Sequence, residues 1–126
     1  MGKTGSYWSG WRLRNLEKYR RDSREKNAKR YARRADWLKG VKAQSKCAVC
    51  GYAGNPGSID AHHVDQQEKK FLVSLQNVTR SREAFYAEMR KCSWVCKNCH
   101  YEIHHQHIDV ADLPRIDPDD YSPMPS

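Results

Sequence analysis

Two C-x2-C pairs constrain the fold of this chain more than any other feature. They are Cys47 with Cys50 and Cys96 with Cys99, and the segment 51–95 separates them. Four thiolates supplied by two such pairs form the tetrahedral set that zinc occupies in closed, structural sites. A structural zinc contributes roughly 10–16 kcal/mol in small zinc-finger peptides, which matches or exceeds the whole stability of a small domain. The spacing therefore predicts that a structural Zn²⁺ decides whether this segment folds.

The cysteine count and the first residues of the sequence indicate the cellular compartment of the protein. The chain has 126 residues and five cysteines. An odd number of cysteines, without an apolar signal-peptide core near the start, favours metal binding over disulfides and predicts an intracellular, cytoplasmic protein. No segment is long and apolar enough to cross a bilayer, so we expect no membrane partner. Cys92, the fifth cysteine, is expected to be a buried apolar residue.

Charge divides the chain into three segments. Residues 1–46 carry 15 Lys and Arg against 4 Asp and Glu, residues 47–109 carry 7 of each sign, and residues 110–126 carry one Arg and four Asp. The local net charges are therefore +11, zero and −3. An excess as large as the first predicts a polyanion partner, and without membrane features the expected polyanion is DNA. We expect a basic DNA-binding arm (1–46), a metal-rich core (47–109) and an acidic, Pro-rich tail (110–126) that is irregular or mobile.

The basic arm is predicted to be a long helix. It has no Pro or Gly between Gly10 and Gly40 and is rich in Arg, Lys, Leu, Glu and Ala, so we expect helix over about 11–39. Trp37 and Leu38 are expected to dock the end of this helix onto the core. The side chains that we assign to phosphate contacts are Arg20, Arg21, Arg24, Arg30, Arg33 and Arg34.

Five of the six histidines fall in two clusters beside the cysteine pairs. The clusters are His62 and His63, and His100, His104 and His105. The first lies in a segment, 59–64, that is typical of a short strand, and the second in a segment, 100–105, that is typical of a helix. His100 and His104 are four residues apart, so they share one helical face and form a two-ligand metal platform. The third ligand is expected from the His62–His63 pair.

Residues 47–104 resemble the HNH endonuclease family, whose small zinc-braced members occur in phages and bacteria. The resemblance rests on CAVC, IDAHHVD, KCSWVC and CKNCHYEIH, in that order, and it covers about half of the chain. It implies a small α+β fold, with a ββα-metal (HNH) core braced by a four-cysteine zinc site and extended by the long basic N-terminal helix. For a phage-encoded member, the cytoplasm would be that of the host cell.

The resemblance also implies a role for each matched residue. His62 matches the metal ligand of the first strand, and His63 matches the general base. His100 and His104 match the remaining ligands of a second, catalytic divalent metal, for which Mg²⁺, Mn²⁺, Ni²⁺ and Zn²⁺ are the candidates. Three imidazoles suit Zn²⁺, Ni²⁺ or Mn²⁺ better than Mg²⁺, which prefers oxygen ligands. Asp60 shares the face of His62, as a partner of an imidazole or an extra ligand.

The chain departs from the family at the asparagine of the His-Asn-His (HNH) motif. The family often has an asparagine five residues before the third cysteine of the pairs, and here that residue is Lys91. Asn77 and Asn98 are substitutes between which the sequence does not choose. The two adjacent histidines add a geometric demand, because neighbouring residues of a regular strand point to opposite faces. For His62 and His63 to meet at one phosphate, the backbone must leave regular strand geometry there.

The implied activity is metal-dependent DNA endonuclease chemistry, which hydrolyses phosphodiester bonds to 5′-phosphate and 3′-hydroxyl ends. His63 would act as general base, with one divalent metal at the scissile phosphate. The alternative, of a different class, is a non-catalytic zinc-dependent nucleic-acid-binding protein or an accessory factor of a larger DNA-processing complex. The retained histidine set favours the enzyme, because binding alone does not need it. A homodimer and a larger complex both stay open as the assembly.

Overall fold

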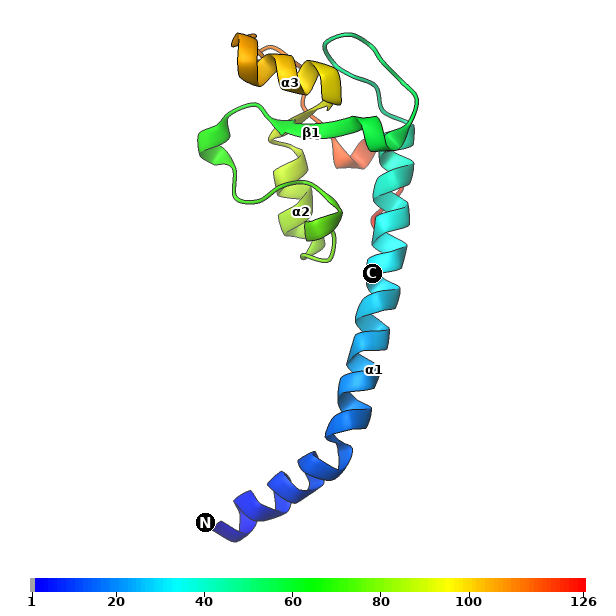
Figure 1. Cartoon of the computed structure of the whole chain (residues 1–126), viewed down its shortest axis with the longest axis vertical. Coiled ribbons are helices and arrows are strands. Elements are labelled where there is room, and N and C mark those ends of the chain that lie inside the picture. Colours follow the sequence, from blue (N-terminus) through cyan, green and yellow to red (C-terminus); the bar gives the residue numbers. More distant parts are fainter. Residues whose placement is uncertain (1) are drawn as a thin grey trace. The chain divides into compact units, whose positions relative to one another are not determined.

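The computed structural model describes residues 2–126, with side chains from residue 10 onward except those of residues 12 and 14. Three α-helices and two strands follow one another in the described chain in the order α1 (Gly2–Ala43), β1 (Ile59–His63), α2 (Arg82–Met89), β2 (Cys92–Cys96) and α3 (Lys97–Gln106) (Figure 1). The chain divides into two compact units, one ending at Ala32 and one covering Arg33–Ser126. The predicted small α+β class is confirmed.

Helix α1 is longer at both ends than the predicted helix over 11–39. The absence of proline leaves its backbone hydrogen bonds uninterrupted. In the first unit, large apolar side chains such as Trp11, Leu13 and Tyr19 are exposed. In the described part of the chain, no helix has the length and the apolar character that crossing a membrane requires.

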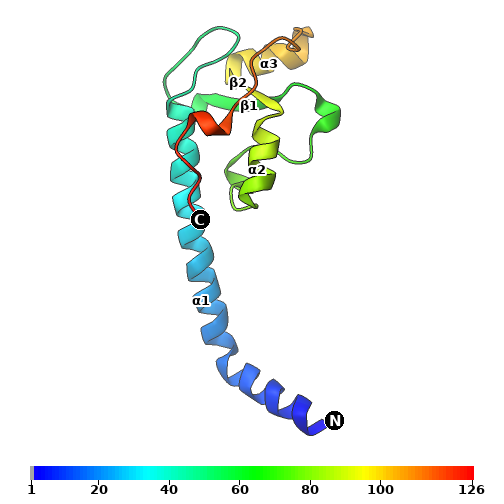
Figure 2. The same ribbon diagram turned by 180° about the vertical axis from the view of Figure 1, so that it is seen from behind.

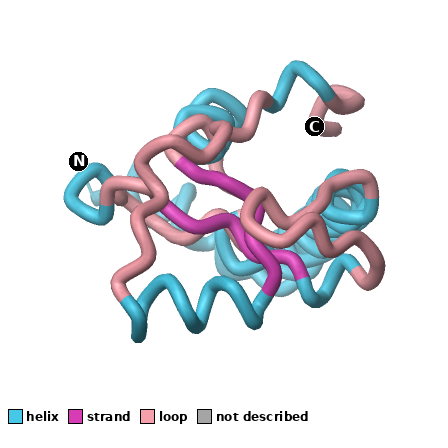
Figure 3. Tube along the Cα trace, turned by 90° about the horizontal axis from the view of Figure 1, so that it is seen from above, coloured by secondary structure: helices cyan, strands magenta, loops and turns pink. Residues whose placement is uncertain are grey.

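The strands β1 and β2 form an antiparallel pair that organises the second unit (Figure 3). Ile59 lies opposite Cys96, His63 lies opposite Cys92, and the residues between them pair in unbroken register. Helices α2 and α3 lie on opposite sides of β1 (Figure 1). Because successive side chains of a strand alternate between its faces, neighbouring residues of β1 point toward different helices.

The core of the second unit lies between this sheet, helix α2 and the last turns of α1. Leu38, Ile59, Phe85 and Val95 are fully buried there. The ring of Trp37 packs edge-on against Phe85, with 6.2 Å between the ring centroids. The prediction that Trp37 and Leu38 dock the end of the arm onto the core is therefore confirmed.

The C-terminal segment, residues 110–126, is irregular apart from a short 3-10 helix at Pro118–Asp120. Its apolar side chains belong to the core, since Ile116 and Met124 are buried. The backbone N–H of Ile116 donates to the carbonyl of Cys92, 2.8 Å away, and the segment continues to the end of the chain beside α1 (Figure 2). Of the two alternatives expected for the tail, the structure shows the irregular one, and these apolar residues pack the segment against the core.

Candidate metal centres

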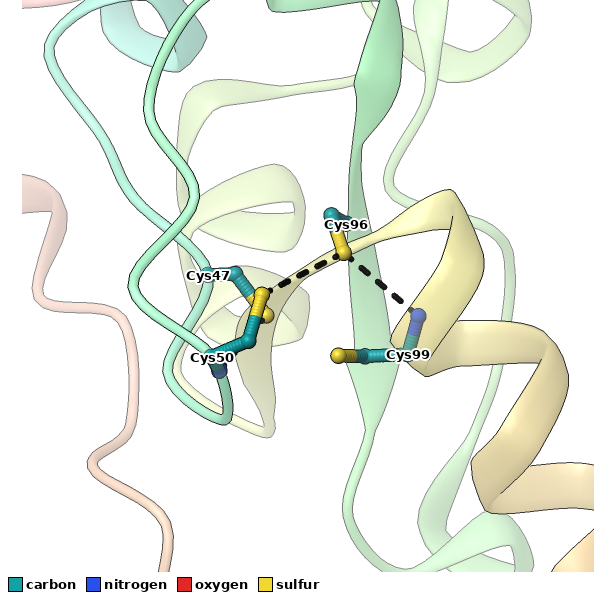
Figure 4. Close-up of side chains that lie close together, drawn as sticks. All are labelled: Cys47, Cys50, Cys96 and Cys99. Carbon is teal, nitrogen blue, oxygen red and sulfur yellow. Dashed lines mark hydrogen bonds between the residues drawn. The ribbon is translucent and has the colours of Figure 1, made fainter.

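The four cysteines of the two C-x2-C pairs come together in one cluster (Figure 4). Their sulfur atoms all lie within 4.8 Å of one another, and the sulfurs of Cys50 and Cys96 are 3.7 Å apart. A zinc ion bound tetrahedrally at about 2.3 Å from each sulfur separates the sulfurs by about 3.8 Å. All the cysteines are free thiols. The donor set and its spacing therefore fit the predicted structural zinc.

Local backbone geometry prepares each pair to hold an ion. The N–H of Cys50 donates to the sulfur of Cys47, and the N–H of Cys99 donates to the sulfur of Cys96, both at 3.4 Å. Gly51 follows the first pair with a φ of 80°, which glycine adopts without a steric penalty. Such N–H···S contacts stabilise negative charge on sulfur. The same contact lets Cys96 act as the N-cap of α3.

The cysteines of the cluster differ from Cys92 in their electrostatic surroundings. Burial by itself raises the pKa of Cys47, but hydrogen bonds from backbone N–H groups, Cys50 first among them, lower it to about 6. Burial raises the pKa of Cys92 to about 12. Cys92 also lies outside the cluster, and its thiol donates to the carbonyl of Glu88. It is therefore the buried, neutral residue that the sequence predicts.

A second cluster consists of His62 on β1 and of His100 and His104 on α3. One ring nitrogen from each lies within 4.8 Å of the others, and the ring centroids are 4.9 to 5.0 Å apart. The pKa of His62 is lowered to about 4. Burial is the largest cause, and the nearby His100 and His104 rings lower the pKa further. A neutral imidazole is the form that binds metal. The three predicted ligands are thus placed around one point in a state fit for coordination.

Asp60 links this cluster to a lysine. Its carboxylate oxygens lie 3.0 Å from Nδ1 of His100 and 2.9 Å from Nζ of Lys97. The hydrogen bond from His100, aided by Lys97, lowers the pKa of Asp60 to about 2 against the opposing effect of burial. Because Nδ1 is engaged, Nε2 of His100 is the nitrogen that remains for a metal ion. Of the two roles expected for Asp60, its contact fits that of a partner to an imidazole.

Three lysines of the second unit interact electrostatically with the histidine cluster or with Asp60. The ammonium of Lys97 is paired with Asp60 while its side chain stays 63% exposed. The charge of Lys69 acts on both His62 and His104, where it adds to the effect of burial and of the other imidazoles in lowering their pKa values. Lys42, whose pKa burial lowers, interacts with Asp60. The sequence did not single out these lysines, because they converge from α1, a loop and α3.

His63 lies on the other face of the two-stranded sheet. It is paired with Cys92 in the regular register, and its ring contacts α2 while His62 contacts α3. The side chain is 2% exposed. The departure from strand geometry that we expected at this point is therefore not observed within β1.

Glu88 of α2 is the partner of His63, with 2.8 Å between Oε2 and Nε2. Lys91 donates to the other oxygen of Glu88. Asn77, one of the two substitutes considered, makes its side-chain hydrogen bonds within its own loop. The sequence contained one signal for Glu88, an acidic residue on the inner face of a helix that is otherwise apolar there.

The predicted phosphate-contacting arginines have different surroundings. Arg20, Arg21 and Arg24 are exposed, as is Arg33, which donates to the carbonyl of Ser126. Arg30 is partly buried. Arg34 is 4% exposed, and its guanidinium donates to the carbonyls of Pro125, Val78 and Arg80. The assignment of Arg34 to DNA is corrected, since its hydrogen bonds hold the core together.

Comparison of this chain with family models, with curated proteins and with solved structures finds no match. The chemistry of the site consequently rests on its own geometry. That geometry offers a closed four-sulfur set and, separately, three imidazoles beside several ammonium groups.

Proposed function

We propose that this protein is a metal-dependent DNA endonuclease that hydrolyses phosphodiester bonds. The observation that carries the proposal is the cluster of His62, His100 and His104, together with the pairing of Lys97 with Asp60 and the charge of Lys69 that acts on His62. Three imidazoles give a divalent ion three ligands and leave coordination positions for a substrate. The lysines add positive charge where a phosphate would approach.

The two clusters would hold two different ions. The four cysteines fit a structural Zn²⁺, while the three histidines fit the catalytic metal, for which Mg²⁺, Mn²⁺, Ni²⁺ and Zn²⁺ are the candidates. When bound, the catalytic ion would neutralise charge on the phosphate and assist the departure of the 3′ oxygen. Asp60 would orient His100 toward it through the hydrogen bond to Nδ1.

We assign His63 as the general base of this reaction, an assignment that requires β1 to leave its regular register when the substrate binds. The oxygen of a water molecule bonds to phosphorus, the bond from phosphorus to the 3′ oxygen breaks, and the proton of the water passes to Nδ1 of His63. The products are a 5′-phosphate and, once protonated, a 3′-hydroxyl. A neutral imidazole is suited to this transfer near pH 7. The engagement of Nε2 by Glu88 supports the assignment, because it reserves Nδ1 as the acceptor.

The arm would supply affinity for DNA. Arg20, Arg21 and Arg24 are exposed and belong to the segment of +11 net charge, so we assign them to phosphate contacts. Such contacts do not read base sequence, and they position the protein on the duplex.

A second candidate function is that of a non-catalytic zinc-dependent nucleic-acid-binding protein or an accessory factor. The burial of His63, on the face of the two-stranded sheet opposite His62, favours this second candidate. A general base has to reach the water that it activates, whereas binding makes no such demand.

Supercoiled plasmid distinguishes the two candidates. We expect zinc-loaded protein to relax or linearise the plasmid when Mg²⁺, Mn²⁺, Ni²⁺ or excess Zn²⁺ is added, and a His104→Ala variant to do so far more slowly. Ends carrying 5′-phosphate and 3′-hydroxyl groups would be resealed directly by DNA ligase. Plasmid that is bound but uncut with every metal would contradict the nuclease and support the binding protein.

A further inference from the structure

Glu88 is a buried carboxylate, 1% exposed, on the inner face of α2. Removing an ionised carboxylate from water is costly unless hydrogen bonds compensate. Here Oε2 lies 2.8 Å from Nε2 of His63 and accepts from the backbone N–H of Lys70 at 3.2 Å, and Oε1 accepts from Nζ of Lys91 at 2.5 Å. Both oxygens are therefore engaged, and Glu88 is held from three directions.

We propose that Glu88 is a positioning residue that fixes the orientation and the tautomer of His63, so that Nδ1 carries the lone pair. A neutral imidazole has one N–H, and an ionised carboxylate can accept a hydrogen bond but not donate one. A contact of 2.8 Å between Glu88 and Nε2 therefore places the hydrogen on Nε2. As a statement about catalysis, this inference rests on the proposed function, in which Nδ1 accepts the proton of the water.

Lys91 supports the orientation of His63 indirectly, through Glu88. Its ammonium donates to Oε1 of Glu88 and to the backbone carbonyl of Glu68, so it is anchored to α2 and to the loop after β1. With Oε1 occupied by Lys91, Oε2 is the oxygen that faces His63. The residue at the family's asparagine position thus acts on the histidine through Glu88 instead of contacting it.

The alternative is that Glu88 and His63 form a buried polar pair with no bearing on the reaction. Such a pair stabilises the fold, and its contact with Nε2 would fix the same tautomer of His63. The two interpretations therefore differ in whether the loss of the Glu88 carboxylate lowers kcat while KM stays near the wild-type value.

The tautomer can be measured by long-range ¹H–¹⁵N correlation on zinc-loaded full-length protein at pH 7.5, without DNA or the second metal. His63→Gln identifies the signals of His63. In the wild type we expect Nε2 to carry the proton and Nδ1 to resonate as an unprotonated nitrogen. Since this spectrum needs no variant of Glu88 and no cleavage, a proton on Nδ1 in the wild type would overturn the proposal whatever the enzyme does.

The matched variants are Glu88→Gln and, as control on the exposed face of the same helix, Glu83→Gln. A glutamine amide can accept or donate, so Glu88→Gln should populate both tautomers of His63 and lower kcat by about 10- to 100-fold, with KM near the wild-type value. Glu83→Gln should change neither. A Glu88→Gln variant that keeps the wild-type tautomer and kcat would also overturn the proposal. Wild-type protein that cuts no plasmid but shows the expected tautomer would contradict the nuclease and leave the positioning of His63 supported.

Discussion

Cys99 and His100 are consecutive residues of α3, yet their side chains belong to different clusters. The sulfur of Cys99 joins the cysteine cluster, and the ring of His100 joins the histidine cluster. Cys96, which also belongs to the cysteine cluster, caps the N-terminus of the same helix. The cysteine cluster therefore fixes the first turn of α3, and that turn in turn places His100. We expect the histidine centre to depend on the cysteine centre, but not the reverse.

Removal of the structural zinc should disable both centres. Cys96→Ser takes away one sulfur and weakens the cap of α3, so we expect protein that is unfolded or insoluble. The wild type should retain about one tightly held zinc per chain after gel filtration, as a closed four-thiolate site does. Metal analysis of the purified protein, with circular dichroism before and after a strong chelator, checks this.

His104→Ala is the control for that experiment, since it removes a ligand of the histidine cluster and leaves the cysteines intact. It should keep the structural zinc and the far-ultraviolet spectrum of the wild type. Folded wild-type protein that contains no zinc would contradict the assignment of the cysteine cluster.

Loss of the Asp60 carboxylate should weaken the binding of a metal ion to the histidine cluster. Asp60→Asn removes the charged partner of His100 Nδ1, and loss of a hydrogen-bond partner behind a metal ligand typically costs about 10- to 100-fold in metal affinity. Competition with a chromophoric chelator for Ni²⁺ or Zn²⁺, in protein already holding its structural zinc, measures the affinity. Lys97→Met removes the other partner of Asp60 and should change metal affinity much less. Equal losses in the two variants would mean that charge, and not the orientation of His100, sets the affinity.

Local patterns were sufficient to predict most of the fold. The segments 59–64 and 100–105 were predicted to be a strand and a helix, and they form β1 and part of α3. The cysteine spacing predicted the cluster, because two C-x2-C pairs have few ways to meet other than around one ion. The spacing predicted that one residue of the His62–His63 pair joins His100 and His104, and the resemblance favoured His62. The structure brings these three together.

Features that depend on contacts between distant segments were not predicted. The pairing of His63 with Glu88 joins residues that are far apart in sequence, and a glutamate in a helix gives no sign of its partner. In the sequence Arg34 resembles any other cation of the arm, but carbonyls at Val78, Arg80 and Pro125 enclose it. The polar, Pro-rich composition of 110–126 obscured the few apolar residues that anchor it.

Substitutions of the two adjacent histidines should separate their roles. His63→Ala removes the proposed proton acceptor and should slow plasmid cleavage by about 10²- to 10⁴-fold, the range of general-base catalysis, at every metal concentration. His62→Ala removes a ligand, so excess metal should partly restore its cleavage. Initial cleavage rates across a metal titration distinguish the two patterns. Near-wild-type cutting by His63→Ala would refute the base assignment and agree with the burial of His63 as a structural feature.

The C-terminal segment should be part of the folding unit. Met124 is fully buried, so Met124→Ala should lower the free energy of unfolding by about 2–5 kcal/mol. Leu72→Ala is the control, because Leu72 is 48% exposed and its truncation should cost about 0.5 kcal/mol or less. Urea denaturation of zinc-loaded protein, followed by tryptophan fluorescence, measures both. Equal midpoints for Met124→Ala and the wild type would show that the segment is not part of the cooperative unit.

Deletion of residues 1–32 should remove most of the affinity for DNA and leave the second unit folded. The cut falls at the boundary between the two units and spares Arg34, Trp37 and Leu38, which a longer deletion would take from the core. For every phosphate that the truncated protein no longer binds, the slope of log affinity against log salt concentration should fall in magnitude by about 0.9.

The triple variant Arg20→Gln, Arg21→Gln, Arg24→Gln measures how much of the salt dependence comes from these three arginines. It should reduce the magnitude of the slope by about 2.7 if all three arginines bind phosphates. Lys97 and Lys69 remain in the truncated protein and in the triple variant, so a residual salt dependence should persist in both. Circular dichroism should show an intact second unit in the truncated protein. Fluorescence anisotropy of a labelled duplex over a series of salt concentrations gives the slopes. An unchanged slope in the truncated protein would show that the arm is a solvated helix, or that its partner is something other than DNA.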